Sequence, residues 1–522
     1  MGYPIRPLAA ALAVAFSAPA AYAQTTLNEV VVSAGKIPEA STPRQIGQAE
    51  IAAKHAVTRD TAALLQDVPG VSLYGAGGVS SLPSIHGLAD DRLRITVDGM
   101  DFIATCPNHM NPPLSYLDPN AVSKIKVYAG ITPVSVGGDS IGGSIVAETA
   151  PPAFAAPGQG LLTKGEIGTF YRSNNNAVGG NVGATVATEN FSVSYTGAMT
   201  KADNYTAGGN FKTTTATGRV GHTLPLDEVG SSAYESQTHT LGFAMRGGNH
   251  LVEAKFAYQD VPEQLYPNQR MDMLGNTAKR YNLRYEGRKD WGKLEARAYH
   301  EPVDHHMDFG ADKAMYYGAL TGTNGQTYPV IGMPMNTTGK TDGVSVKAEV
   351  PLSDMQLGRF GVDWQQYRLN DWWPPAPDCG VGICTGGMAP YTFWNIKDGQ
   401  RDRQAFFGEL ESRWSDQWFS LFGVRSENVS MNTGAAQGYN TGMMYAGSAI
   451  SSTGGAATYN ALEKQRKDNN IDWTAMSRYT PDDQKSFEFG LAQKTRSPNL
   501  YERYAWSTNS MAMEMVNWVG DG

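Results

Sequence analysis

The chain has 522 residues, of which 41% are hydrophobic and only 18% are charged, and it contains 58 glycines. This composition argues against a helical bundle and is typical of β-rich proteins with many turns. The formal net charge of -8 argues against nucleic acid as a partner.

Residues 1–23 have the organisation of a secretory signal peptide. Arg6 supplies a positive charge, an alanine-rich apolar run follows, and Ala21-Tyr22-Ala23 is a cleavage site of the A-x-A type. The alternative is a buried N-terminal helix, but the apolar run is short and ends in small residues. Export predicts an oxidising compartment. No later segment has about 18 consecutive apolar residues, so the sequence predicts no transmembrane helix. A membrane-spanning β-barrel also lacks such runs, because its apolar residues alternate with polar ones.

Residues 24–39 form a predicted linker that begins with a short apolar, β-branched stretch, Leu27 to Ser33. On its own this stretch could be the first strand of any domain. A flexible exported strand is also suited to β-augmentation, in which it joins the sheet edge of another protein.

Residues 40–155 are predicted to form an α/β module. The spacing of Ala62, Leu65 and Val68 predicts a helix that stops at Pro69-Gly70. Alternating apolar residues predict strands in "DRLRITVDGM" and "AVSKIKVYAG", and a glycine-rich turn leads to another in "VGGDSIGGSIVAET". The paired glycines are not followed by Gly-Lys-Ser/Thr, so a phosphate-binding loop is rejected.

From residue 156 to 522 the pattern changes to long alternating strands in pairs. Val252, Ala254 and Phe256 share an apolar face, whereas Glu253 and Lys255 point to the other. Short polar turns join the members of each pair, and loops of about 20–40 residues join the pairs. Strand length and this turn asymmetry favour a transmembrane antiparallel β-barrel, with lipid outside and a polar lumen, over a soluble sandwich or propeller.

The predicted barrel is incomplete. We expect about 13 strands before the sequence stops in a loop at Gly522. Single-chain bacterial barrels have an even number of strands, and an unpaired edge in lipid is untenable. We therefore expect the sequence to be truncated at its C-terminus.

The order of these parts resembles the TonB-dependent outer-membrane receptors. "LLQDVPGVSLYG", "IHGLADDRLRITVDGM" and "IKVYAGITPVSVGGDSIGGSIVAET" resemble stretches of their plug domain, and "KTRSPNLYERY" resembles a late barrel motif. The resemblance implies a barrel of about 22 strands with the plug inside its lumen. It also implies uptake across the outer membrane, driven by the inner-membrane TonB–ExbB–ExbD complex. The TonB box would be Leu27, Asn28, Glu29, Val30, Val31 and Val32.

Within that family the chain is most similar to the OprC/NosA-type copper receptors, which carry Cys-x-x-x-Met in the plug and His-x-Met in the barrel. The matching residues here are Cys106 and Met110, in the proline-rich loop "ATCPNHMNPP", and His305 and Met307, in "VDHHMDF". The resemblance therefore implies a copper site shared between plug and barrel.

The chemistry of these residues agrees with that implication. Thiolate and thioether ligands select Cu(I), and imidazole suits copper in either oxidation state. Residues two apart on a strand share a face, so His305 and Met307 should point together and His306 away. The strand that carries them runs from a short turn towards a long loop, so its end should lie near the outer mouth.

The cysteine count supports a special role for Cys106. Cys379 and Cys384 lie in an outer loop with glycines between them and can close a small disulfide. Cys106 is then unpaired, which an exported protein must explain. Metal coordination is one explanation, and a buried inert thiol is the other.

Other soft donors are secondary candidates for copper. His109 and His306 could be further ligands or neighbours that form hydrogen bonds. Methionine pairs recur in the predicted outer loops, where they could capture Cu(I) or simply fill gaps in packing. These pairs are Met271/Met273, Met333/Met335, Met443/Met444 and Met511/Met513/Met515.

The sequence thus predicts an importer of copper rather than an enzyme, because no nucleophile–base set, paired carboxylates or nucleotide loop is evident. Three alternatives stay open. They are a receptor for a siderophore, haem or cobalamin on the same fold, a surface binding protein that does not transport, and a redox protein that reduces Cu(II) through Cys106.

Overall fold

The computed structural model describes most of the chain between Pro43 and Ser507. The predicted signal peptide, the predicted TonB box and the pair Cys379 and Cys384 lie outside the described residues. The described ranges are 43–54, 57–75, 77–219, 221–314, 316–321, 327–331, 333–375, 390–440, 455–482 and 484–507.

The N-terminal part is a small mixed domain, which we call the plug. Its main sheet has five strands in the order β1-β7-β8-β5-β6, in which β5 and β8 run parallel and the other pairs are antiparallel. These strands are β1 (Arg44–Ile46), β5 (Leu93–Val97), β6 (Met100–Asp101), β7 (Val122–Tyr128) and β8 (Gly143–Thr149). A second sheet contains β2 (Val71–Tyr74), β3 (Leu82–Ile85) and β4 (Leu88–Ala89). The helices are α2 (Gln48–Lys54), η1 (Thr61–Leu65), η2 (Asp90–Arg92), η3 (Pro113–Tyr116) and η4 (Pro119–Ala121).

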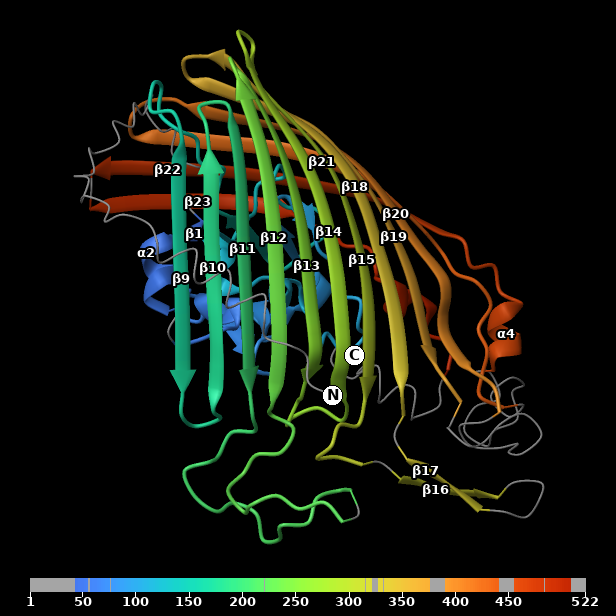
Figure 1. The fold of residues 1–522 in the computed structure, drawn as a ribbon. Coiled ribbons are helices and arrows are strands. Elements are labelled where there is room, and N and C mark those ends of the chain that lie inside the picture. Colours follow the sequence, from blue (N-terminus) through green and yellow to red (C-terminus); the bar gives the residue numbers. More distant parts are fainter. Residues whose placement is uncertain are drawn as a thin grey trace, which may run out of the picture. The chain divides into compact units, whose positions relative to one another are not determined.

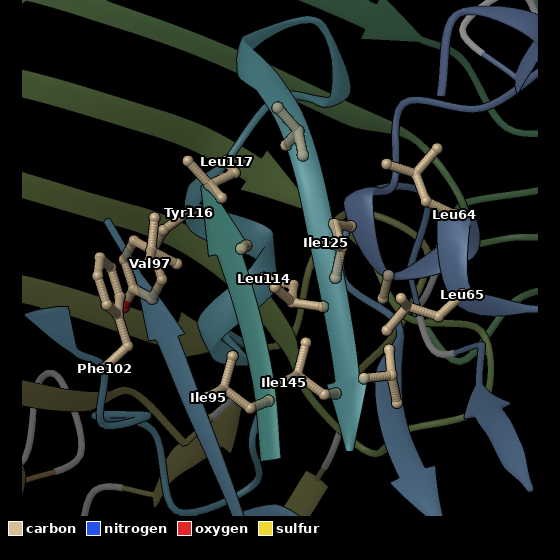
Figure 2. Close-up of a cluster of buried hydrophobic side chains, with 14 of the residues drawn as sticks. Leu64, Leu65, Ile95, Val97, Phe102, Leu114, Tyr116, Leu117, Ile125 and Ile145 are labelled. Carbon is tan, nitrogen blue, oxygen red and sulfur yellow. The ribbon is translucent and has the colours of Figure 1, made fainter. Parts of the chain in front are cut away.

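The plug is organised around a hydrophobic core, to which Ala278 and Val303 of the large sheet also contribute. Alternate residues of β5, β7 and β8 point into it, and short helices cover it with leucines (Figure 2). Ile125 and Ile145, both fully buried, lie at its centre. The core members labelled in Figure 2 are Leu64, Leu65, Ile95, Val97, Phe102, Leu114, Tyr116, Leu117, Ile125 and Ile145.

The helix predicted before Pro69 is shorter and tighter than expected. It is a 3₁₀-helix that ends at Leu65, and the Asp60 side chain caps it by accepting a hydrogen bond from Ala62 N at 3.1 Å. The chain continues in tight turns, with Val68 N donating to Leu65 O at 2.9 Å. Val68 is still buried in the core, so the spacing of Ala62, Leu65 and Val68 is the one expected for a helix.

The rest of the chain forms one antiparallel sheet of 13 strands, as predicted (Figure 1). The strands pair in sequence order, and the hairpin of β16 (Tyr316–Thr321) and β17 (Thr327–Ile331) is inserted between β15 and β18. The strands are β9 (Leu162–Arg172), β10 (Ala177–Ala187), β11 (Phe191–Ala202), β12 (Tyr234–Gly247), β13 (His250–Gln264), β14 (Asp272–Lys289), β15 (Gly292–Asp308), β18 (Met335–Ser353), β19 (Gln356–Trp373), β20 (Phe393–Arg413), β21 (Trp418–Asn432), β22 (Arg466–Asp482) and β23 (Lys485–Gln493). Two short helices follow late strands, α4 (Ala456–Asn460) and α5 (Leu500–Tyr504). Among the described helices, none is long and apolar enough to span a membrane.

The two faces of this sheet differ in chemistry. On β20, Arg403 and Glu409 are buried against the plug, where they contact Asp101 and Ser135. Phe406, on the opposite face of the same strand, is 59% exposed. Exposed aliphatic and aromatic residues recur on this outer face along most strands, which suits contact with lipid.

Ion pairs join the plug to the inner face of the sheet. Asp98 lies 3.0 Å from the Lys255 ammonium, Asp139 lies 2.5 Å from Arg401, and Asp101 pairs with Arg403. Burial raises the pKa of Asp101, but the nearby guanidinium groups outweigh burial and hold that pKa below its usual value. A cavity of about 150 Å³ lies beside the Asp101–Arg403 pair, and charged side chains of both plug and barrel line it. The plug–barrel interface therefore contains ion pairs as well as apolar contacts, such as the packing of Ile131 of the plug against Phe419 and Met476 of the sheet.

Ile145→Ala should destabilise the plug by about 2–5 kcal/mol, because it removes fully buried methyl groups from the core. Limited proteolysis should show faster cleavage within the plug, while the barrel keeps its heat-modifiable migration on gels. The matched control is Ile141→Ala, since this side chain is 45% exposed and should change plug stability by about 0.5 kcal/mol or less. Equal proteolysis of the two variants would contradict the assigned core.

Candidate metal centre

The loop between β6 and η3 folds back on itself around Cys106. His109 N donates to Cys106 O at 3.0 Å, which closes a tight turn, and His109 takes a left-handed conformation with φ of 50°. The Cys106 N–H in turn donates to the Asn111 side-chain oxygen at 3.1 Å. Pro107 is the second residue of the turn, Pro112 and Pro113 follow it, and Cys106 and Met110 are both buried. The loop thus holds a thiol and a thioether close together in sequence and out of solvent.

On the barrel wall, strand alternation sorts the residues of "HHM" as predicted. His305 and Met307 are buried on the inner face of β15. His306 is on the other face and forms a hydrogen bond with Asn336 Oδ1 at 2.8 Å. One imidazole and one thioether of this strand therefore point towards the plug.

The two segments meet. Cys106 Sγ lies 4.0 Å from Met307 Sδ, although 201 positions separate the residues in sequence. The side-chain amide of Asn108 lies 3.9 Å from the same thioether. His305 connects to the loop through Asn276, whose Oδ1 lies 3.3 Å from His305 Nδ1. The structure thus brings Cys106, Met307 and His305 into one buried place, with Met110 in the same loop.

His305 has one ring nitrogen without a partner. Its Nε2 is buried and forms no hydrogen bond within the described residues. An unsatisfied buried polar atom costs about 1–3 kcal/mol and calls for an explanation. A metal ion bound at this nitrogen would supply the missing interaction.

The thiol of Cys106 is neutral in the metal-free protein. Burial raises its pKa to about 12, although the backbone N–H groups of Met110 and Asn108 point at the sulfur and act in the opposite direction. A cation that binds this sulfur as thiolate must therefore displace a proton.

A row of methionines crosses the wall at this level. Met273 of β14, Met307 of β15 and Met335 of β18 are direct cross-strand partners, so their side chains share one face. All three are buried, as are Met271 and Met333. The prediction that these pairs belong to outer loops was therefore wrong for Met273 and Met335, which lie in strands beside Met307. The remaining methionine pairs, at 443–444 and 511–515, lie outside the described residues.

The secondary histidines have other neighbours. His109 Nε2 lies 3.7 Å from Asp90 Oδ1. His306 is occupied with Asn336 on the outer face of the strand. The structure therefore does not bring either imidazole to the pair of sulfur atoms.

Two asparagines, Asn111 and Asn276, contact the predicted site residues and were not predicted. Asn111 lies next to Met110 in the sequence, which is the one signal that could have drawn attention to it. Among the described residues, no group of three or more His, Cys, Asp and Glu side chains could hold a metal ion. A site at this place would therefore depend on thioethers together with the one thiol and one imidazole.

Comparison with known proteins identifies two matching domain families. Residues 37–144 match the TonB-dependent receptor plug domain, and residues 156–518 match the TonB-dependent receptor-like β-barrel. No curated protein matches the chain significantly.

Many solved structures share the fold. One titled "Copper transporter OprC" is 21% identical, with a TM-score of 0.68 over 85% of this chain and 63% of that one. The FrpB iron transporter from Neisseria meningitidis is 15% identical, with a TM-score of 0.61 over 89% of this chain and 65% of that one. The unliganded ferric citrate transporter FecA is 14% identical, with a TM-score of 0.62 over 90% and 64%. The chain thus spans less than two thirds of the length of each.

Cys106 should resist alkylation in the folded, metal-free protein. At pH 8 a thiol whose pKa is about 12 has about 1,000-fold less thiolate than one at the ordinary 9.0. Iodoacetamide labelling, followed by mass spectrometry in a Cys379→Ser/Cys384→Ser background, measures this one thiol. The same protein unfolded in detergent and urea is the control and should label at the ordinary rate. Rapid labelling of the folded protein would contradict the burial of the thiol.

Proposed function

Because the chain belongs to the TonB-dependent receptors of the bacterial outer membrane, we propose that it imports copper, as Cu(I), through a site shared by plug and barrel. The observation that carries this proposal is the approach of Cys106 Sγ to Met307 Sδ at 4.0 Å, together with the buried Nε2 of His305, which has no hydrogen-bond partner in the part of the chain that the structure describes. Met110 supplies the fourth donor from the plug loop.

The donor set favours copper over iron. Thiolate and thioether sulfur bind Cu(I) well, whereas iron carried by citrate or a siderophore is already held by its chelator and needs no protein ligands. The similar copper transporter OprC supports this choice, although iron transporters share the fold at lower identity. The four proposed ligands are also all buried, which shields a bound ion from solvent.

Transport follows from the position of the ligands. Copper arrives from outside and joins Cys106 and Met110 on the plug to His305 and Met307 on the wall. The segment Leu27–Val32 then adds as a strand to TonB, which the ExbB–ExbD complex energises from the inner membrane. Pulling on the plug separates the two pairs of ligands, so the same movement that opens a path also releases the ion.

The buried methionines beside the site extend the proposal. Met335 is the cross-strand partner of Met307, and Met333 lies two residues before Met335 in the sequence. Both thioethers can therefore transfer Cu(I) to the main site. His109 and His306 serve as neighbours rather than ligands in this proposal, since each faces another polar side chain. Lipid of the outer membrane covers the apolar outer face of the barrel.

Replacing Cys106 by Ser or Met307 by Leu should abolish tight copper binding, because each change removes a sulfur donor from a different domain. The copper content of the whole protein purified in detergent, measured by metal analysis, should fall from one copper per chain to nearly none. His306→Ala is the matched control and should keep its copper, because this neighbouring imidazole faces away from the site.

Unchanged copper content in the Cys106 and Met307 variants would reject the site. Binding of a haem or a ferric siderophore by those variants and by wild type would support the receptor alternative. An oxidised Cys106 with no retained metal would support the redox alternative. Copper binding without uptake, unaffected by deletion of Leu27–Ser33, would support a surface binding protein.

Copper binding should release one proton and tighten as pH rises. The pKa of Cys106, raised to about 12 by burial, keeps the thiol protonated, so binding as thiolate expels a proton and Kd should fall about tenfold per pH unit near neutral pH. Calorimetric titration in two buffers of different ionisation enthalpy counts the protons. A binding heat that is independent of the buffer would contradict coordination by the Cys106 thiolate.

A further inference from the structure

The proposed ligands of plug and barrel are joined by an unbroken chain of hydrogen bonds. Cys106 N donates to Asn111 Oδ1 at 3.1 Å, and Asn111 Nδ2 donates to Asn276 Oδ1 at 3.0 Å. Asn276 Oδ1 also lies 3.3 Å from His305 Nδ1. Both asparagines and the histidine are almost completely buried, at 1%, 2% and 3% exposure. This series of hydrogen bonds crosses from the plug to β14 and ends on β15.

The direction of every bond in this chain is fixed by its first member. A backbone N–H can only donate, so the Asn111 atom that faces Cys106 must be the oxygen. The other end of that amide is then the NH₂ group, and the Asn276 atom that receives it must be an oxygen too. An amide oxygen can only accept, so His305 Nδ1 must carry the proton that points at it.

The tautomer of His305 follows. With the proton on Nδ1, the Nε2 atom of a neutral imidazole carries the free lone pair. This is the same Nε2 that is buried without a hydrogen-bond partner among the described residues. Metal-binding imidazoles are commonly aimed in this way by a hydrogen bond at their other nitrogen.

We propose that Asn111 and Asn276 are positioning residues, which set the tautomer and aim of His305 so that Nε2 is presented to the ion. This inference rests on the proposed copper site and adds a coupling between its halves. The acceptor that orients the wall imidazole is itself held by an amide of the plug, so the barrel donor is fully prepared only while the plug loop is docked. Withdrawing the plug removes Asn111 from Asn276 as well as two sulfur ligands from the ion.

The test compares two substitutions of the same residue. Asn276→Leu removes the acceptor at nearly equal volume, whereas Asn276→Asp keeps an oxygen that accepts in either protonation state. We expect Asn276→Leu to weaken Cu(I) affinity about 10–100-fold and to lose the imidazole signature in X-ray absorption, with sulfur scatterers retained. Asn276→Asp should keep both the affinity and the imidazole. Wild-type affinity and an intact imidazole signal in Asn276→Leu would overturn the proposal.

A second measurement does not depend on copper and uses a variant only to assign one signal. Nitrogen-15 NMR of histidine-labelled, metal-free wild type, assigned by difference from His305→Ala, reports which ring nitrogen holds the proton. We expect the proton on Nδ1, and a proton on Nε2 would overturn the inference. A wild-type protein that binds no copper but shows the Nδ1 tautomer would sink the proposed function while leaving the orienting role of Asn276 intact.

Discussion

A thiol and a thioether can lie in contact inside a protein only if everything around them is held in place. The 4.0 Å approach of Cys106 to Met307 joins two parts of the chain that share no local structure. On one side a turn that contains Pro107 fixes the thiol, and on the other the hydrogen-bonded ladder of β15 fixes the thioether. The proposed site therefore depends on the docking of the plug against the barrel, and the polar contacts between them serve that docking.

The features that follow from the two-residue alternation of side chains along a β-strand could be predicted from the sequence. Alternation along a strand has a period of two, so "HHM" alone indicates that His305 and Met307 share a face and that His306 does not. The paired alternating runs predicted a sheet of about 13 strands, and the sheet has that number. The family motifs supplied what local patterns cannot, namely the expectation that the plug and the barrel contribute to one site.

Strand register was not predictable. Met273 lies beside Met307 only because a bulge between Met273 and Gly275 shifts the pairing of β14. Met335 lies on the other side only because the hairpin of β16 and β17 is inserted without changing the pairing of β15 with β18. Asn276 is the cross-strand partner of His305 in the register that begins at the short turn between β14 and β15, but asparagine carries no sequence signal for orienting a histidine. The 3₁₀-helix before Pro69 shows a similar limit, since its apolar spacing fits either helix type.

If an inner-membrane motor pulls on the plug as proposed, the charged groups between plug and barrel affect the force that it must exert. If only apolar side chains filled this interface, separating them would expose apolar surface to water, and the free-energy cost would grow in proportion to the area exposed. Carboxylates and guanidinium groups such as Asp101 and Arg403 instead regain hydration as they separate, and the neighbouring 150 Å³ hollow has room for the first water molecules. The ion-paired part of the interface can therefore hold the plug at rest and still separate in water at a lower free-energy cost than an apolar surface of the same area.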